Sequence, residues 1–94
     1  MADFRITTPR LLNKRRDGQP YGSVYIGRPS RWGNPFVIGR DGDRQGVIDR
    51  YRQLLCDQPA LVEVAKRELR GKDLVCWCAP APCHGDVLIE VANG

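Results

Sequence analysis

The segment Asp73-Leu74-Val75-Cys76-Trp77 decides the fold that this sequence predicts. Its short apolar run is typical of a strand that is buried within a sheet. A second run, Ser23-Val24-Tyr25-Ile26-Gly27, is rich in β-branched and aromatic residues and predicts a partner strand. The two strands are far apart in the chain, so a long connection must join them.

Helical patterns fill that connection. Asp43 is a candidate N-cap, and apolar residues then recur with helical spacing at Val47, Ile48, Tyr51, Leu54 and Leu55. A second helix is predicted from Pro59 to its end at Gly71, with an inner face of Leu61, Val62, Ala65 and Leu69. A last helix begins near Cys83, and its inner face is Val87, Leu88, Val91 and Ala92.

The order strand, helices, strand, helix predicts a small α/β fold, with a short, largely parallel sheet and a βαβ crossover packed by about three helices. Its 94 residues predict one domain spanning 1–94. Residues 1–22 are expected to be a less regular basic segment. Within it, Phe4–Thr8 is a candidate strand that ends at Pro9, and residues 13–20 are expected to form a loop with a turn at Asp17-Gly18.

Composition narrows the class of protein. No apolar run approaches the ~20 residues of a membrane-spanning helix, so no membrane contact is expected. The residues after Met1 lack the apolar stretch of a secretory signal, which favours a cytoplasmic protein. Its four cysteines are then expected to be reduced, and metal binding or catalysis is favoured over a disulfide framework. Lone Cys56 is expected to pack at a helix end.

Charge is distributed unevenly along the chain. The net charge is +4, with 11 basic and 5 acidic residues in 1–52 and 4 basic and 6 acidic residues in 53–94. Arginine predominates among the basic residues, and its planar guanidinium suits phosphate. An anionic partner such as a nucleotide or nucleic acid fits this pattern, although net charge by itself is more typical of an ordinary soluble surface.

The most distinctive stretch of the sequence is residues 76–86, which contains three cysteines, the only histidine and an aspartate. One hypothesis is a zinc ion bound by Cys76, Cys78, Cys83 and His84, three sulfurs and one nitrogen. The spacing is imperfect for zinc, because neighbouring residues 83 and 84 would both have to reach one ion.

A second hypothesis is catalytic. Cys83 lies where the last helix begins, and a helix N-terminus stabilises a thiolate, so Cys83 is a candidate nucleophile. His84 and Asp86 are candidates for proton transfer. A third interpretation is structural, with Cys76 packed as a small apolar residue and with His84 and Asp86 capping the helix.

A second polar cluster follows the first predicted strand. Its candidate ligand-binding residues are Arg28, Ser30, Arg31, Trp32 and Asn34. Two arginines can clamp a phosphate, the indole offers a stacking face, and the asparagine amide both donates and accepts. Alternatively, the tryptophan is core and the arginines are solvated. In open α/β sheets, ligands bind at the carboxyl ends of the strands, so this loop and the cysteine loop are expected to form one site.

The motifs Gly27-Arg28-Pro29-Ser30-Arg31-Trp32-Gly33-Asn34-Pro35-Phe36 and Cys76-Trp77-Cys78, together with Pro82-Cys83-His84-Gly85-Asp86-Val87-Leu88, resemble the family called domain of unknown function 4326. The resemblance runs approximately from Val24 to Asn93. The family occurs in bacteria and their phages, which implies a role with nucleotides or nucleic acid, or interference with a host protein. The basic N-terminal loop is peculiar to this chain.

These observations lead to two hypotheses of different kinds. The first is a small intracellular enzyme, a hydrolase or transferase, that binds a nucleotide or nucleoside-like ligand through Arg28, Arg31 and Asn34. In it, Trp32 lines the pocket, and Cys83, His84 and Asp86 carry the chemistry. The second is a non-catalytic, zinc-stabilised module that binds nucleic acid or a host protein through its basic half.

Overall fold

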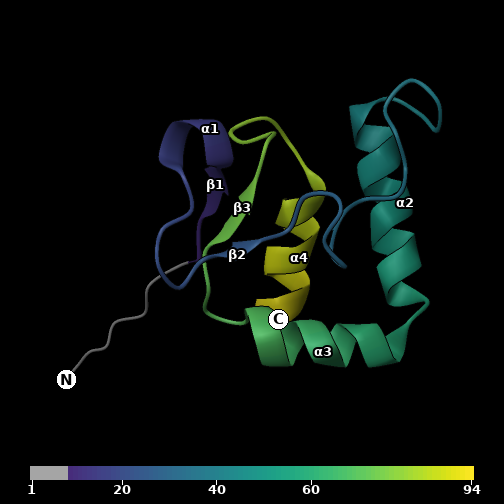
Figure 1. The fold of residues 1–94 in the computed structure, drawn as a ribbon. Coiled ribbons are helices and arrows are strands. Elements are labelled where there is room, and N and C mark those ends of the chain that lie inside the picture. The colour runs from purple at the N-terminus through teal and green to yellow at the C-terminus, as the bar shows by residue number, and fades with distance from the viewer. Residues whose placement is uncertain (1–8) are drawn as a thin grey trace.

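The computed structural model describes residues 9–94, which form a three-stranded sheet and four helices. Their order is β1 (Leu11–Asn13), α1 (Lys14–Asp17), β2 (Val24–Tyr25), α2 (Arg44–Cys56), α3 (Pro59–Leu69), β3 (Leu74–Cys76) and α4 (His84–Asn93). Figure 1 shows α4 between the sheet on one side and α2 on the other, with α3 across the ends of both helices. None of the described helices has the length and apolar character needed to cross a membrane.

The sheet is parallel throughout, as the sequence predicts. β3 is its central strand, in the order β1-β3-β2, with Leu74 opposite both Leu11 and Val24. All three residues of β3 are buried, whereas the two of β2 are half-buried. The chain passes from β2 to β3 through α2 and α3, which is the predicted helical crossover. The observed strands are shorter than the predicted ones, because both neighbours pair with β3 over only two or three residues.

The helices pack through the predicted apolar stripes. Asp43 caps α2, since its Oδ1 accepts a hydrogen bond of 2.7 Å from the Gly46 amide. Pro59 is the first residue of α3. The core joins residues from the sheet and all three longer helices, including Ile26, Tyr51, Leu55, Leu69, Leu74, Val87 and Leu88. Cys56 is exposed, so the expectation that it packs is wrong; it is the last residue of α2, followed by Asp57 in the C-cap position.

The N-terminal segment is more regular than predicted. Leu11–Asn13 form β1, and the segment expected to be a loop begins with the one-turn helix α1. Asn13 connects the two, because its Oδ1 accepts from the amides of Arg15 and Arg16 at 2.9 and 3.2 Å. Gly18 ends α1 with a φ of 66°, at the predicted turn. The candidate strand Phe4–Thr8 lies outside the described residues.

Asp73 joins β1 to β3 at the amino end of the sheet. Its Oδ1 accepts a hydrogen bond of 2.8 Å from the Arg10 amide, and its Oδ2 lies 2.9 Å from Arg10 Nη2. The Arg10 guanidinium holds the pKa of the Asp73 carboxyl below its ordinary value of 3.8. This carboxylate therefore stabilises the fold above that value, and its contribution is lost as the pH falls through the lowered pKa of the folded state.

We expect Asp73→Asn to be less stable than the parent at pH 7, because it loses the ion pair while keeping an acceptor for the Arg10 amide. The difference in urea midpoint between the two proteins should shrink as the pH is lowered below about 4. A difference that stays constant from pH 7 to pH 3 would contradict this account. Asp49→Asn is the control, since Asp49 is an exposed carboxylate on α2 that forms no ion pair with the residues the structure describes.

Candidate functional site

A cavity of about 160 Å³ lies beyond the carboxyl ends of β2 and β3. Gly27, Arg28, Asn34 and Phe36 contribute to its wall from the loop after β2, and residues 76–78 and 82–84 contribute from β3 and the loop that follows it. The parallel arrangement of the strands brings these two loops together, because both leave the sheet at the same edge. Each loop contains one cis peptide bond, Arg28–Pro29 in the first and Ala79–Pro80 in the second.

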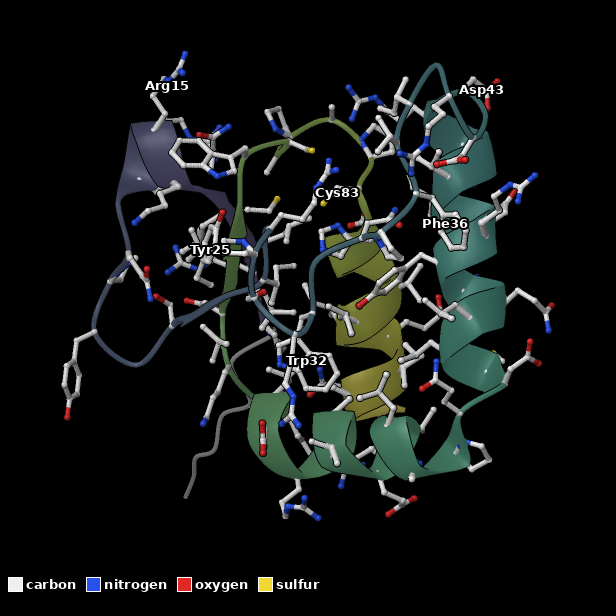
Figure 2. All side chains as sticks on the ribbon, turned by 45° about the vertical axis from the view of Figure 1, so that its right-hand side comes forward. Arg15, Tyr25, Trp32, Phe36, Asp43 and Cys83 are labelled. Carbon is white, nitrogen blue, oxygen red and sulfur yellow. The ribbon has the colours of Figure 1, made fainter. Side chains whose placement is uncertain are left out.

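Three sulfur atoms converge on this cavity. The Sγ atoms of Cys76, Cys78 and Cys83 all lie within 4.8 Å of one another, and all three residues line the cavity. Cys76 is held by the central strand, and Cys83 is the N-cap of α4. These two side chains are buried, while Cys78 is exposed. Figure 2 places Cys83 at the upper end of α4, between the sheet and α2.

The buried pair Cys76 and Cys83 shares a hydrogen bond. The Cys83 thiol donates to Cys76 Sγ at a distance of 3.3 Å, and the Cys78 amide donates to the same sulfur at 3.4 Å. The hydrogen bond from Cys83 lowers the pKa of Cys76 to about 6. The same bond raises the pKa of Cys83, and burial adds to that rise. The pair therefore holds one negative charge readily, with the remaining proton between the two sulfurs.

His84 is held by a hydrogen bond on one side of its ring and contacts Cys83 on the other. Its Nε2 lies 2.9 Å from the carbonyl oxygen of Ile26, which can only accept, so Nε2 carries the hydrogen. Nδ1 is then the unprotonated nitrogen, and it lies 3.5 Å from Cys83 Sγ. Burial lowers the pKa of His84 and keeps the ring neutral. The Tyr51 ring packs edge-on against it at 4.9 Å between centroids.

Asp86 caps α4 and does not line the cavity. It accepts a hydrogen bond of 3.1 Å from the Cys83 amide, while Cys83 Sγ accepts one of 3.3 Å from the Gly85 amide. These two bonds form a capping box at the start of the helix. At this position the carboxylate turns back toward the N-cap, so the structure does not bring Asp86 to the cavity for the proton transfer that the sequence suggested.

Asn34 and Gly33 shape the loop after β2. The buried Asn34 amide donates to the Val47 carbonyl at 3.1 Å and accepts from the Phe36 amide at 2.9 Å, which ties the loop to α2. Both functions of its amide are thus used within the protein. Gly33 packs so closely on Arg28 that a Cβ at position 33 would lie 3.0 Å from the Arg28 Cα. This contact helps to place Arg28 in the cavity wall.

Three of the predicted ligand-binding residues lie away from the cavity wall. Trp32 is 3% exposed and belongs to the core, so it offers no free stacking face. Arg31 Nη1 lies 3.5 Å from Glu68 Oε1 on α3. Ser30 Oγ is buried without a hydrogen-bond partner among the described residues. In the view of Figure 2, the labelled Trp32 lies between Cys83 and α3. The packing interpretation therefore holds for Trp32, because its side chain is buried in the hydrophobic core.

The structure adds two residues that the sequence reasoning missed. Arg44, the first residue of α2, lines the cavity, and its Nη1 donates to the Pro82 carbonyl at 3.1 Å. Trp77 also lines it, is 52% exposed, and donates from its indole nitrogen to Tyr25 Oη at 2.8 Å. A signal for Arg44 was present, since the first helix after a strand starts at the same sheet edge as the site. Nothing in the sequence distinguishes exposed Trp77 from buried Trp32.

Replacing Asn34 with alanine should destabilise the protein by about 1–3 kcal/mol, because it removes the buried bond to the Val47 carbonyl and leaves the partly buried Phe36 amide without its acceptor. Urea unfolding at pH 7 measures the change. Gln45→Ala is the control, since it alters an exposed residue of α2 and should change the free energy of unfolding by less than about 0.5 kcal/mol. Equal stability of the Asn34→Ala variant and the parent would show that this amide does not hold the loop.

The chain resembles viral proteins of similar size. It is 35% identical over 88 residues to the "Uncharacterized 12.4 kDa protein in nrdA-td intergenic region" of Enterobacteria phage T4, covering 89% of this chain and 77% of that protein. It is 28% identical over 100 residues to an uncharacterized protein of Acanthamoeba polyphaga mimivirus, covering 87% of this chain and 75% of that protein. No solved structure matches. The profile of domain of unknown function 4326 matches residues 11–94, from β1 through the whole site, and the chain belongs to that family.

Proposed function

We propose that this protein is a small enzyme that binds a nucleotide or nucleoside-like ligand in the cavity and catalyses hydrolysis or group transfer at its phosphate or glycosidic centre. One observation carries the proposal: Arg28 and Arg44 line the same cavity as the cysteine cluster and His84. Cationic side chains beside a wall of thiols and imidazole combine anion binding with groups capable of chemistry.

The two arginines are available to an anion. Both are exposed, and neither forms an ion pair with a carboxylate within residues 9–94. Arg31, in contrast, is paired with Glu68, and Arg52 is paired with Glu90 at 2.7 Å. A phosphate at the cavity mouth would therefore meet guanidinium groups that no acidic side chain neutralises.

The size of the cavity limits which part of a ligand enters it. Cavities of about 150 Å³ accommodate a benzene-sized ring, whereas pockets for larger ligands span about 300–1,000 Å³. At about 160 Å³ this cavity suits one ring. Trp77 and Phe36 supply aromatic wall to it. The charged part of the ligand then lies at the mouth, which fits a monophosphate better than a dinucleotide.

We expect Arg28→Gln and Arg44→Gln each to weaken the binding of nucleoside 5′-monophosphates at least about tenfold, since each loses a charge-assisted contact of about 1.4 kcal/mol or more. Calorimetric titration with the four monophosphates, and with inorganic phosphate and the nucleosides alone, measures this. Arg67→Gln is the matched control, because it removes an exposed arginine of α3 away from the cavity.

Turnover is assayed on the monophosphate that binds best, by chromatography for free base and orthophosphate. Binding without either product would remove hydrolysis from the proposal and leave group transfer to an acceptor other than water. Absence of binding by all four monophosphates at millimolar concentration, or equal weakening by Arg67→Gln, would contradict the proposal as a whole.

One observation favours the second candidate, a nucleic-acid-binding module. The basic helix α1 begins beside the site, and Arg15 and Asn13 border a shallow hollow together with the exposed Trp77. Exposed aromatic rings with neighbouring basic residues are typical of single-strand binding. Binding of a single-stranded oligonucleotide that falls steeply with salt and is unchanged by Arg28→Gln, without monophosphate binding, would favour this candidate.

A further inference from the structure

We infer that Cys76, Cys78 and Cys83 form a binding site for one thiophilic divalent metal ion of the zinc class, with the fourth coordination position facing the cavity. The inference is independent of the proposed ligand. It starts from the convergence of three sulfur atoms within 4.8 Å of one another, from two secondary-structure elements and the loop between them.

The separation of the sulfurs is close to what a tetrahedral ion requires. Zinc–sulfur bonds of about 2.3 Å at tetrahedral angles place ligand sulfurs about 3.8 Å apart. Cys76 and Cys83 Sγ lie 3.3 Å apart, and the whole group lies within 4.8 Å. Movements of several tenths of an ångström to about 1 Å would therefore bring the three sulfurs to coordination distance. Cys78, in an exposed loop position, is free to make most of that movement.

Backbone amides already point at two of these sulfurs. The Cys78 amide donates to Cys76 Sγ at 3.4 Å, and the Gly85 amide donates to Cys83 Sγ at 3.3 Å. Such N–H groups stabilise negative charge on sulfur and orient the ligands of a metal. Three thiolates this close would repel one another strongly without a cation. Packing alone does not account for the arrangement, because Cys78 is exposed and yet its sulfur lies with the other two.

The fourth coordination position is not filled by the residue that the sequence suggested. His84 was a candidate ligand, but its nitrogen atoms are not part of the group that lies within 4.8 Å. Its Nε2 is bonded to the Ile26 carbonyl, and Nδ1 contacts only Cys83 among the three cysteines. All three cysteines line the cavity, so a fourth ligand would come from the cavity itself. Three protein ligands and one exchangeable position are the arrangement of catalytic rather than structural zinc sites.

Cobalt titration tests the site directly. The reduced, metal-free protein is titrated with Co²⁺, after a thiol count has confirmed four free cysteines. We expect one equivalent to bind, with thiolate-to-cobalt charge-transfer absorption in the near ultraviolet and visible bands of a four-coordinate ion, and we expect Zn²⁺ to displace it. Cys78→Ser should weaken binding at least about 100-fold, which exceeds the loss typical of an outer partner.

Cys56→Ser is the matched control, because it removes an exposed cysteine outside the cluster and should bind Co²⁺ like the parent. Circular dichroism checks that each variant is folded. Four free thiols without charge-transfer absorption, or equal loss in Cys56→Ser and Cys78→Ser, would overturn the site. For the open position, added azide should shift the visible bands of the parent. Unchanged bands with azide, together with their loss in folded His84→Ala, would instead assign the fourth position to His84.

Discussion

The pairing of β3 with both of its neighbours is the constraint on which the rest of the structure depends. β3 has three residues, and all are buried. Its backbone forms hydrogen bonds on both sides. The Leu74 amide donates to the Arg10 carbonyl, and the Val75 carbonyl accepts from the Ile26 amide at 2.9 Å. Because β3 is central and buried, the residue at its carboxyl end, Cys76, is held by the core of the sheet.

The start of α4 carries the second half of the candidate site and also caps a core helix. Cys83 takes the capping role that Ser, Thr, Asp or Asn more commonly fills. Its sulfur accepts from the Gly85 amide while it donates to Cys76. The same side chain thus begins a core helix and lines the cavity. His84 follows directly and is anchored to the Ile26 carbonyl, at the end of β2. The polar groups are held by core elements rather than by loops alone.

The elements with strong periodic patterns could be predicted from the sequence. Three local patterns also indicate where their element lies in the fold: the Asp43 cap, the apolar stripe of α2 and the buried run of β3. β1 could not be predicted, since three residues contain too little pattern and the strand forms only through its pairing with β3. Strand topology also predicted that the two polar loops face one cavity, because parallel strands end at a common edge.

Individual side chains in the site were harder to predict. Trp32 and Trp77 have the same side chain, yet one is core and the other is half-exposed. Which of them is buried depends on the tertiary packing of the loops after β2 and β3, and no local sequence pattern predicts that packing. An aspartate at a helix start can cap the helix or transfer a proton. Here Asp86 accepts a hydrogen bond from the Cys83 amide and therefore caps the helix. Arg44 could have been found from its place at the start of α2, at the sheet edge where the two loops meet, rather than from any local motif.

The contact between Gly33 and Arg28 has a consequence for how this site can vary. The atom nearest to an added Cβ is the Arg28 Cγ at 2.9 Å, followed by backbone atoms of the same residue at 3.0 and 3.1 Å. The close approach of the main chain at position 28 therefore depends on the absence of a side chain at position 33. Any side chain at position 33 displaces the main chain at position 28. Substitutions at Arg44 or Trp77 would alter the cavity wall one residue at a time, whereas a side chain at position 33 would also shift the loop after β2.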